Sequence, residues 1–565
     1  MGSKHGDQTG GVNVSVHLTE MASTHPWRRA VVMPAARDRA NRVLYAHYTF
    51  RQLDRAADRI AHGLSDVGIG RGIRTILMVG PSLDFFALTF AMFKVGAVPV
   101  MVDPGMGIGR MLSCLQESRP EGFVGIPKAH VLRSLRPRYF RSVNTWITIG
   151  RRWFWGGHTL AELQHRPWKP YPAASTARNE TAAILFTTGS TGPAKGVVYT
   201  HGMFDAQVRA IGDRFGIEPG EIDLPTFPLF ALFAPALGMT AVIPDMDPTR
   251  PARVDPVKII EAVDNQGVTN MFASPALLHR VGADGKQRKI KLASVRRVIS
   301  AGAPTLPANV AQFAEMLTGG AQVHSGYGAT EAMPVSSIGS REILSETAKM
   351  SEQGRGTCVG TPLSGMEVRI IEISDDPIPE WSETLCLPDG KIGEIAVKGA
   401  VVSRNYFERP RDDALSKIRD KGSFWHRMGD VGWRDEKGRI WFCGRKGHRV
   451  QTAAGPLFTI PCEAIFNRHP DVFRSALVGA GRPGNQTPVI CIEPGKKLTS
   501  KRRAALRTEL LDLARRAAVT AQIETVLFHP AFPVDIRHNS KIFREKLAVW
   551  AEKKIRRMPK MPKMS

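Results

Sequence analysis

The sequence has few cysteines for its length: six among 565 residues, none of them in a Cys-x-x-Cys pair. Scattered cysteines provide neither a disulfide framework nor the ligand spacing of a zinc site. The first 30 residues are polar and contain no apolar segment of the kind found in a secretory leader. Both observations favour a protein that works in the reducing cytoplasm.

Long uninterrupted hydrophobic runs are also missing. The two most apolar stretches are residues 76–102 and 228–244. Asp84 and Lys94 interrupt the first, Pro228 and Pro235 interrupt the second, and the second is also short, so no transmembrane segment is predicted. Because a hydrophobic content of 43% is that of a globular protein, we expect both stretches to be buried.

Acidic residues are outnumbered, since 52 Asp and Glu stand against 77 Lys and Arg, for a net charge of +25. Residues 537–565 hold ten basic residues against Glu545 and Glu552. No finger, RNA-binding or basic-zipper motif accompanies this charge, so nucleic acid is not a predicted partner. The favoured interpretation is a solvated basic tail, or contact of that tail with an acidic protein or an anionic lipid surface.

The hydrophobic pattern predicts an α/β fold. A capping box at Thr49 begins a helix whose apolar residues recur every three or four positions. Strand, helix and strand then follow over residues 76–102, and helix and strand recur over residues 257–273. This alternation is typical of mostly parallel sheets flanked by helices.

A chain of this length exceeds a single core, so at least two domains are expected. We place the boundary near residues 444–448, where two glycines follow an apolar strand and permit a hinge. The predicted parts are a flexible N-terminus (1–30), a large domain (31–446), a small mobile α+β domain (447–550) and a basic tail (551–565).

The most informative segment is residues 187–196, Thr-Thr-Gly-Ser-Thr-Gly-Pro-Ala-Lys-Gly, which stands between two apolar runs. Its glycines let backbone N–H groups turn toward an anion, its hydroxyls donate further hydrogen bonds, and its lysine adds a positive charge. The spacing differs from the common nucleotidase loop. A Ser/Thr/Gly-rich linker is the alternative, but a linker is not expected between two strands. The candidate phosphate-binding residues are Thr187, Thr188, Gly189, Ser190, Thr191, Gly192 and Lys195.

Two further segments suit a nucleotide base. Residues 300–304 contain small side chains, Gly302, Ala303 and Pro304 among them, that let a flat base lie against the backbone, although an ordinary strand-end turn fits equally well. In residues 325–331, Tyr327 lies between Gly326 and Gly328 and offers an aromatic face. Thr330 and Glu331 then supply a phosphate donor and a magnesium ligand. A buried tyrosine in a turn beside an unrelated glutamate is the alternative.

A carboxylate in a Gly-flanked turn, Asp430, suits the two hydroxyls of a ribose, with Arg445 nearby. A solvent-exposed turn is the plainer interpretation of these residues by themselves. Near the end of the chain, Lys541 stands in the segment 533–544 among other basic residues, where a lysine is ordinarily a surface residue.

Taken in order, these five segments resemble the adenylate-forming (ANL) superfamily over roughly residues 45–548. That superfamily includes acyl-CoA synthetases, luciferases and the adenylation domains of peptide synthetases, and its members use ATP to convert a carboxylate into an acyl-adenylate and pyrophosphate. The resemblance implies ATP and Mg²⁺ as cofactors. It implies that Tyr327 stacks on adenine, Thr330 meets the α-phosphate, Glu331 holds Mg²⁺ and Asp430 binds the ribose beside Arg445.

The same resemblance makes Lys541 the adenylation lysine, whose charge offsets the negative charge that builds on the α-phosphate and carboxylate oxygens. Glu331 and Thr187 complete the catalytic residues that it implies. Two positions depart from the superfamily pattern: Ser540 stands where a glycine usually precedes the lysine, and Gly447 stands where the hinge usually has Asp or Lys.

The candidate acyl-binding residues are apolar: Met203, Phe204, Phe227, Phe230 and Phe233. Such side chains line long-chain pockets, although an aromatic stripe is as often plain core. In many acyl-CoA synthetases a histidine near the acyl carboxylate occupies the position of Ala231. This difference weakens the prediction of a thioester-forming enzyme.

The amino-acid sequences of residues 187–204, 228–233 and 534–541 look most like those of the olefin β-lactone synthetases of bacterial long-chain hydrocarbon synthesis. That likeness implies adenylation of a long-chain 2-alkyl-3-hydroxyalkanoic acid, whose own hydroxyl closes a β-lactone and releases AMP. It also implies a lactone-processing decarboxylase (hydrolase) and a ketone reductase as pathway partners. His201 and His448 are candidates by residue type for the base.

Three alternatives stay open at this point. The main one is a long-chain fatty acyl-CoA synthetase, and the second is a fatty acyl-AMP ligase that feeds a carrier protein. The third is a degenerate adenylating fold that serves as a scaffold. Retention of Lys195, Glu331, Asp430, Arg445 and Lys541 together argues against a scaffold.

Overall fold

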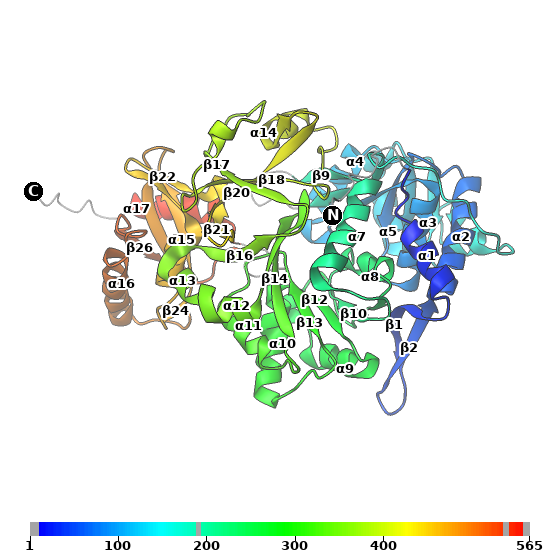
Figure 1. The fold of residues 1–565 in the computed structure, drawn as a ribbon, viewed down its shortest axis with the longest axis horizontal. Helices are drawn as coiled ribbons and strands as arrows, with labels where there is room; N and C mark the ends of the chain where they lie inside the picture. Colours follow the sequence, from blue (N-terminus) through cyan, green and yellow to red (C-terminus); the bar gives the residue numbers. More distant parts are fainter. Residues whose placement is uncertain (1–10, 188–193, 535–541, 558–565) are drawn as a thin grey trace, which may run out of the picture.

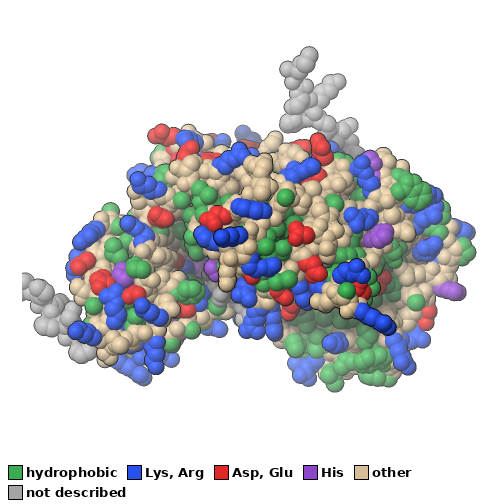
Figure 2. Space-filling model, turned by 90° about the horizontal axis from the view of Figure 1, so that it is seen from below, with side chains coloured by type: hydrophobic (Ala, Val, Ile, Leu, Met, Phe, Trp, Pro, Cys, Tyr) green, Lys and Arg blue, Asp and Glu red, His purple; other side chains and the backbone are tan. Residues whose placement is uncertain are grey.

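The computed structural model describes residues 11–187, 194–534 and 542–557. Two large sheets with helices on their faces make up most of the molecule, and a smaller C-terminal unit lies at one end of its long axis, coloured orange to red in Figure 1. Basic side chains are spread over the face seen in Figure 2. This architecture agrees with the predicted α/β fold and its small additional domain.

The first sheet is built from the N-terminal third of the chain. All of its neighbouring strands run parallel except the last pair, which joins across the glycine-rich loop. Within the described residues its order is β7 (His158–Thr159), β6 (Thr145–Thr148), β5 (Gly122–Gly125), β3 (Arg74–Met78), β4 (Val98–Val102), β8 (Thr181–Thr187) and β9 (Lys195–Thr200). The two predicted strands, one before and one after the glycine-rich segment, are therefore confirmed, whereas residues 188–193 lie outside the described residues.

The capping box is also confirmed, because the Thr49 hydroxyl accepts from the Gln52 amide and the Gln52 side chain accepts from the Thr49 amide. It begins α2 (Phe50–Asp66), which buries one face against the apolar α3 (Leu83–Val95). The large domain's other helices are α1 (Val16–Thr24), α4 (Ile108–Glu117), α5 (Pro127–Leu135), α6 (Leu160–Gln164), α7 (His201–Phe215), α8 (Phe233–Ala236), α9 (Pro256–Gln266), α10 (Pro275–Arg288), α11 (Pro307–Ala314), α12 (Ser340–Glu342), α13 (Ala348–Met350) and α14 (Pro410–Ser416).

The second sheet has a parallel centre and an antiparallel extension that the hydrophobic pattern did not predict. The parallel strands are β1 (Arg29–Arg37), β11 (Thr240–Val242), β10 (Ile222–Pro225), β12 (Asn270–Ala273), β13 (Arg297–Ser300) and β14 (Gln322–Ala329). The antiparallel strands are β2 (Val43–Thr49) at one edge and, beyond β14, β15 (Ala332–Gly339), β16 (Thr357–Pro362), β21 (Ile440–Arg445), β20 (Ser423–Arg434), β18 (Gly393–Lys398) and β17 (Glu367–Ile371), with β19 (Lys417–Asp420) paired to β20.

The C-terminal unit has hydrophobic clusters of its own, whose buried members all lie between residues 450 and 551. Its elements are β22 (Val450–Thr452), β23 (Gly455–Leu457), α15 (Thr459–Phe466), β24 (Val472–Ala480), β25 (Thr487–Pro494), α16 (Ser500–Arg515), β26 (Thr525–Phe528) and α17 (Arg544–Ile555). A separate core is what a domain boundary near residues 444–448 requires. The boundary itself, and movement of this unit, stay predictions.

Two predicted segments differ from the structure. Residues 1–30 are not flexible throughout, because α1 packs Leu18 into the core and Val14 is buried beside it. The basic tail also begins later than residue 551, because Ala551 is buried within α17. In both places a few apolar residues at helical spacing pack against the core. The mainly polar composition of these segments gave no sign of that packing.

No helix of the described residues is both long enough and apolar enough to cross a membrane. The six cysteines are all unpaired.

Candidate active site

The carboxyl ends of four parallel strands meet at one edge of the second sheet. The register pairs Pro225 with Phe272, Ala273 with Ser300, and Ser300 with Ser325. The candidate acyl and adenine residues lie beyond this edge, at 227–233 and 302–304 in the segments that follow β10 and β13, and at 326–328 in the last part of β14. Ligands of open α/β sheets bind at this kind of edge. The fold therefore brings three separately predicted segments together.

Tyr327 and Asp430 are in direct contact across this edge. The tyrosine hydroxyl donates a 2.7 Å hydrogen bond to Asp430 Oδ2, and Arg445 Nη1 lies 3.0 Å from Oδ1 in an ion pair. Asp430 does not lie in a turn, as predicted, but within strand β20, opposite Arg445 in β21. The exposed-turn interpretation is wrong as well, because Asp430 is buried.

The Asp430 carboxylate has spare hydrogen-bonding capacity. Its Oδ1 atom is buried and accepts no hydrogen bond, even though the arginine lies close by. Burial raises the pKa of Asp430, and the charge of Arg445 opposes that rise. A buried carboxylate oxygen without a donor fits a ligand hydroxyl, as the predicted ribose contact requires.

Glu331 stands at the turn between β14 and β15, and Tyr406 holds it there. The Tyr406 hydroxyl donates a 2.8 Å hydrogen bond to Glu331 Oε1, and the Ser403 amide donates to the Glu331 carbonyl oxygen at 2.8 Å. Thr330 is fixed by the Tyr199 hydroxyl, which donates to its carbonyl oxygen at 2.6 Å. The turn is thus tied both to β9 and to residues 403–406.

Lys195 joins the same cluster from the phosphate-loop side. Its Nζ lies 4.9 Å from the centre of the Tyr406 ring and 2.6 Å from an Asp412 oxygen. The predicted phosphate lysine and the predicted magnesium carboxylate therefore flank one tyrosine.

The sequence reasoning missed Tyr406 and Lys417. Lys417 begins β19 and donates to the Ser403 carbonyl oxygen, and its Nζ lies 5.9 Å from the centre of the Tyr406 ring. Burial lowers the pKa of Lys417 to about 7, against the opposing charges of Glu331 and Asp413. Neither residue stands in a motif with a recognisable spacing, so no local signal identified them.

Several predicted site residues lie outside the residues that the structure describes. These are Thr188, Gly189, Ser190, Thr191 and Gly192 of the loop, the side chain of Thr187, and Lys541. The chain on both sides of Lys541 is anchored, because Val534 and Ile542 form a β-bridge. Arg544, three residues beyond the lysine, forms a bidentate ion pair with buried Glu463. Its Nη1 and Nη2 atoms lie 2.5 and 2.9 Å from the two carboxylate oxygens.

The candidate acyl residues form a half-buried aromatic row. Phe230 stacks on Phe272 with ring centres 4.1 Å apart, and contacts Phe227 and Phe233 at 5.6 and 6.1 Å. Phe204 packs on Tyr199, and Met203 is buried on the same helix. Ala231 is wholly buried in the hydrophobic core of the large domain. Their role toward an acyl chain stays a prediction.

His201 is not placed to act as a base. It is fully buried, its Nδ1 accepts from the Val14 amide at 3.2 Å, and burial lowers its pKa to about 4. It also lies at the opposite end of β9 from Lys195. His448 lies in the short helical turn that follows Arg445 and stays a candidate by residue type.

The residues present suit a magnesium ion held mostly by phosphates. No cluster of three or more potential metal-ligating His, Cys, Asp or Glu side chains occurs among the residues that the structure describes. Mg²⁺ in nucleotide sites is commonly held by one or two carboxylates and the substrate phosphates, with waters completing the shell. Glu331, beside the phosphate-loop lysine, fits that pattern.

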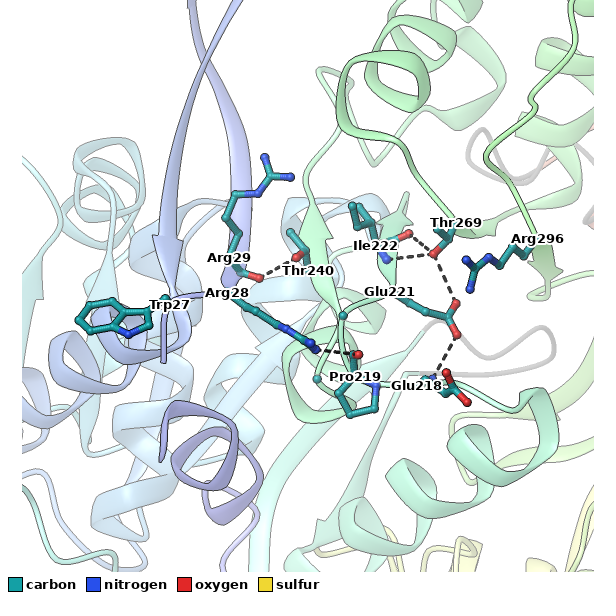
Figure 3. Close-up of a pocket in the computed structure, with 12 residues that line it drawn as sticks. Trp27, Arg28, Arg29, Glu218, Pro219, Glu221, Ile222, Thr240, Thr269 and Arg296 are labelled. Atoms are coloured by element: carbon teal, nitrogen blue, oxygen red, sulfur yellow. Dashed lines mark hydrogen bonds between the residues drawn. The ribbon is translucent and has the colours of Figure 1, made fainter. Parts of the chain in front are cut away.

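A surface cavity of about 580 Å³ lies elsewhere, at the amino edge of the second sheet (Figure 3). Its most buried polar group, Glu221, is already paired with Arg297 and accepts from Thr269 at 3.3 Å. Arg28 likewise donates to the Pro219 carbonyl oxygen at 2.8 Å. Because these groups satisfy one another, the carboxyl edge is the better candidate for the active site.

Comparison with known proteins decides the family. The model of the family described as AMP-binding enzyme matches residues 18–407. The chain is an AMP-binding enzyme. The olefin beta-lactone synthetase of Stenotrophomonas maltophilia is 49% identical to it over 95% of this chain and 98% of that protein. The olefin beta-lactone synthetase of Xanthomonas campestris pv. campestris is 47% identical, over 95% and 97%.

Solved structures share the fold of this AMP-binding enzyme. The amide bond synthetase McbA of Marinactinospora thermotolerans superposes with a TM-score of 0.76 at 21% identity, covering 95% of this chain and 99% of that one. The ATP-bound MatB of Rhodopseudomonas palustris gives 0.76 at 19% identity, covering 96% and 99%. The family and the two relatives show that this AMP-binding enzyme activates an acid and forms AMP.

Proposed function

We propose that this enzyme is an ATP-dependent β-lactone synthetase that acts on a long-chain 2-alkyl-3-hydroxyalkanoic acid in olefin biosynthesis. The observation that carries the proposal is the close relationship, over nearly the whole chain, to the two olefin beta-lactone synthetases. The site at the carboxyl edge supplies a chemistry consistent with that relationship.

The first step activates the acid. A carboxylate oxygen of the substrate attacks the α-phosphorus of ATP, the bond to the bridging oxygen breaks, and pyrophosphate leaves. Tyr327 offers its ring to the adenine, Asp430 accepts from the ribose hydroxyls, and Lys195 meets the phosphates. Mg²⁺, held beside Glu331, would neutralise phosphate charge. Lys541 would stabilise the charge that develops around the α-phosphate.

The second step closes the ring. The 3-hydroxyl oxygen of the acyl group attacks its own activated carbonyl carbon, the bond from that carbon to the phosphate oxygen breaks, AMP leaves, and the hydroxyl proton passes to a base. The nucleophile is part of the bound acyl group, so its proximity needs no second substrate. Cleavage of the ATP anhydride drives formation of the strained four-membered ring.

A feature of the site favours ring closure over thioester formation. Ala231, at the position where many acyl-CoA synthetases have a histidine, is fully buried and offers no proton-transfer group. The half-buried row of Phe227, Phe230 and Phe233 supports an acid with long alkyl chains.

The test is turnover without coenzyme A. The purified enzyme, given ATP, Mg²⁺ and a 2-alkyl-3-hydroxy acid, should release pyrophosphate and AMP and yield a β-lactone identified by NMR or mass spectrometry. A matched 2-alkyl acid without the 3-hydroxyl should be adenylated but form no lactone. A requirement for coenzyme A, with a thioester as product, would show instead a fatty acyl-CoA synthetase.

A further inference from the structure

An exposed aromatic loop projects from the edge of the first sheet. Residues 150–157, Gly-Arg-Arg-Trp-Phe-Trp-Gly-Gly, connect β6 to the edge strand β7. Trp153 is 54% exposed and Phe154 is 77% exposed, and Arg151 and Arg152 before them are exposed too. Large apolar side chains displayed together on a surface mark a place of contact with another body.

Trp155 anchors the loop to the first sheet and to α5. Trp155 is buried and stacks on His130 of α5, with ring centres 5.2 Å apart and planes within 5°. Its indole nitrogen donates a 2.9 Å hydrogen bond to the Thr148 hydroxyl. The rings of Trp153 and Phe154 lie 5.4 and 5.0 Å from that of Trp155. Because the loop is already fixed by Trp155, its exposed aromatic side chains lose little conformational entropy on binding.

The surroundings of the loop are strongly basic. Residues 122–161 contain seven Lys and Arg and no Asp or Glu. Partly exposed Ile126 and exposed Lys128 begin α5 at the same sheet edge, because Gly125 pairs with Thr148 at the ends of β5 and β6. Arg152 pairs with Glu162 at 3.7 Å, and this exposed ion pair contributes little.

We infer that this loop docks the enzyme on the surface of a lipid bilayer that carries anionic headgroups. Tryptophan prefers the headgroup level of a bilayer, and basic residues there are attracted by anionic lipids. Since no described helix can cross a membrane, the contact is with the surface. An acid with two long alkyl chains partitions into bilayers, because its apolar surface leaves water there. This last argument rests on the proposed function, whereas the binding itself does not.

An acidic protein is the competing occupant, and two features favour the bilayer over it. The exposed Trp153 and Phe154 are adjacent in the chain and directly follow two exposed arginines, which is the combination that an anionic bilayer surface attracts. Between Glu121 and Glu162 every charged residue is basic, and this excess of one sign suits the uniform negative charge of an anionic bilayer surface.

Sedimentation of the full-length protein with vesicles tests this inference. The protein should bind vesicles of phosphatidylcholine with phosphatidylglycerol, and bind pure phosphatidylcholine more weakly. The double variant Trp153→Ser/Phe154→Ser should lose on the order of tenfold in partitioning. Neutralising Arg151→Gln should cost about fivefold on the anionic vesicles. The control is Trp27→Ser, at a tryptophan that is 73% exposed elsewhere, which should bind as the parent does.

Quenching by brominated lipid separates this loop from the basic end of the chain. Tryptophan fluorescence of the parent protein should be quenched in brominated vesicles, and Trp153→Phe should lose that quenching. Equal vesicle binding by the parent and the double aromatic variant would overturn the inference. So would a Trp153 whose fluorescence the brominated lipid does not quench.

The competing occupant has its own signature. If soluble polyglutamate abolishes co-sedimentation with vesicles and no quenching occurs, the loop is a surface for an acidic protein instead. Adenylation of a soluble short-chain acid should be unchanged in all loop variants, which separates this test from that of the proposed function.

Discussion

The hydroxyl of Tyr327 donates a 2.7 Å hydrogen bond to the carboxylate of Asp430, 103 positions further along the chain. The residue proposed to stack on adenine thereby orients the residue proposed to bind the ribose. The opposite oxygen of Asp430 faces Arg445 and still lacks a hydrogen-bond donor. The two halves of a nucleoside would thus be recognised by one coupled group rather than by separate contacts.

This coupling makes Tyr327 informative. Tyr327→Phe keeps the aromatic face and removes the hydrogen bond, so the KM for ATP should rise about five- to tenfold, since such a bond contributes about 1 kcal/mol. Tyr327→Ala also removes the stacking and should cost more, by about 1–3 kcal/mol for the lost base contact. Steady-state kinetics with varied ATP measure both. Tyr171→Phe, which removes a hydrogen bond to Ser65 far from the site, is the matched control. Equal effects of Phe and Ala at 327 would contradict stacking.

Glu331 should govern the magnesium requirement. Glu331→Gln keeps the shape and the contact with Tyr406 but removes the charge, so the Mg²⁺ concentration for half-maximal rate should rise at least about tenfold. Tyr406→Phe leaves the charge and releases the carboxylate from its 2.8 Å hydrogen bond, and should have a milder effect of about fivefold. Initial rates over a Mg²⁺ titration at fixed ATP distinguish the two. An unchanged Mg²⁺ dependence in Glu331→Gln would remove Glu331 from the metal site.

Lys541→Ala should slow adenylation by roughly 10²–10³ while ATP binding changes little, because the lysine acts on charge that develops in the transition state. Arg544→Met should share this signature more weakly, since the ion pair with Glu463 anchors the chain three residues beyond the lysine. Pre-steady-state pyrophosphate release and equilibrium ATP binding give the two readouts. Arg556→Gln, which breaks an exposed pair with Glu552, is the control. Parallel losses of rate and ATP affinity would refute the assigned role.

Asp223 should make stability fall with rising pH. Burial raises the pKa of Asp223 to about 8, above its ordinary value of 3.8, so the folded state keeps a proton that the unfolded chain has already lost. The resulting stability is complete below about pH 4 and is lost as the pH rises toward 8. Asp223→Asn removes this dependence and lets position 223 donate to Asn270 Oδ1, a buried atom without a donor.

Thermal unfolding at pH 5 and pH 8 checks this expectation. The gain in Tm of Asp223→Asn over the parent should be larger at pH 8. Asp389→Asn, at an exposed ion pair with Arg434, should show no such pH-dependent difference. A gain that is the same at both pH values would mean that Asp223 is ionised in the folded protein throughout this range.

The sequence by itself determined the local features. The capping box at Thr49, the strands on both sides of the glycine-rich loop and the α/β alternation follow from the spacing of a few neighbouring residues, which is why they were predictable. The phosphate-loop composition and the tyrosine between two glycines likewise carried their chemistry in adjacent positions.

Only the tertiary structure decided which distant residues share the site. Tyr406 reaches Glu331 across 75 positions, and Lys417 joins them from β19, because the order of antiparallel strands beyond β14 brings this part of the chain back onto β9. The α1 helix is ordered by the core surface it covers. Contacts of this range depend on strand order and burial, and no periodicity in the neighbouring residues encodes them.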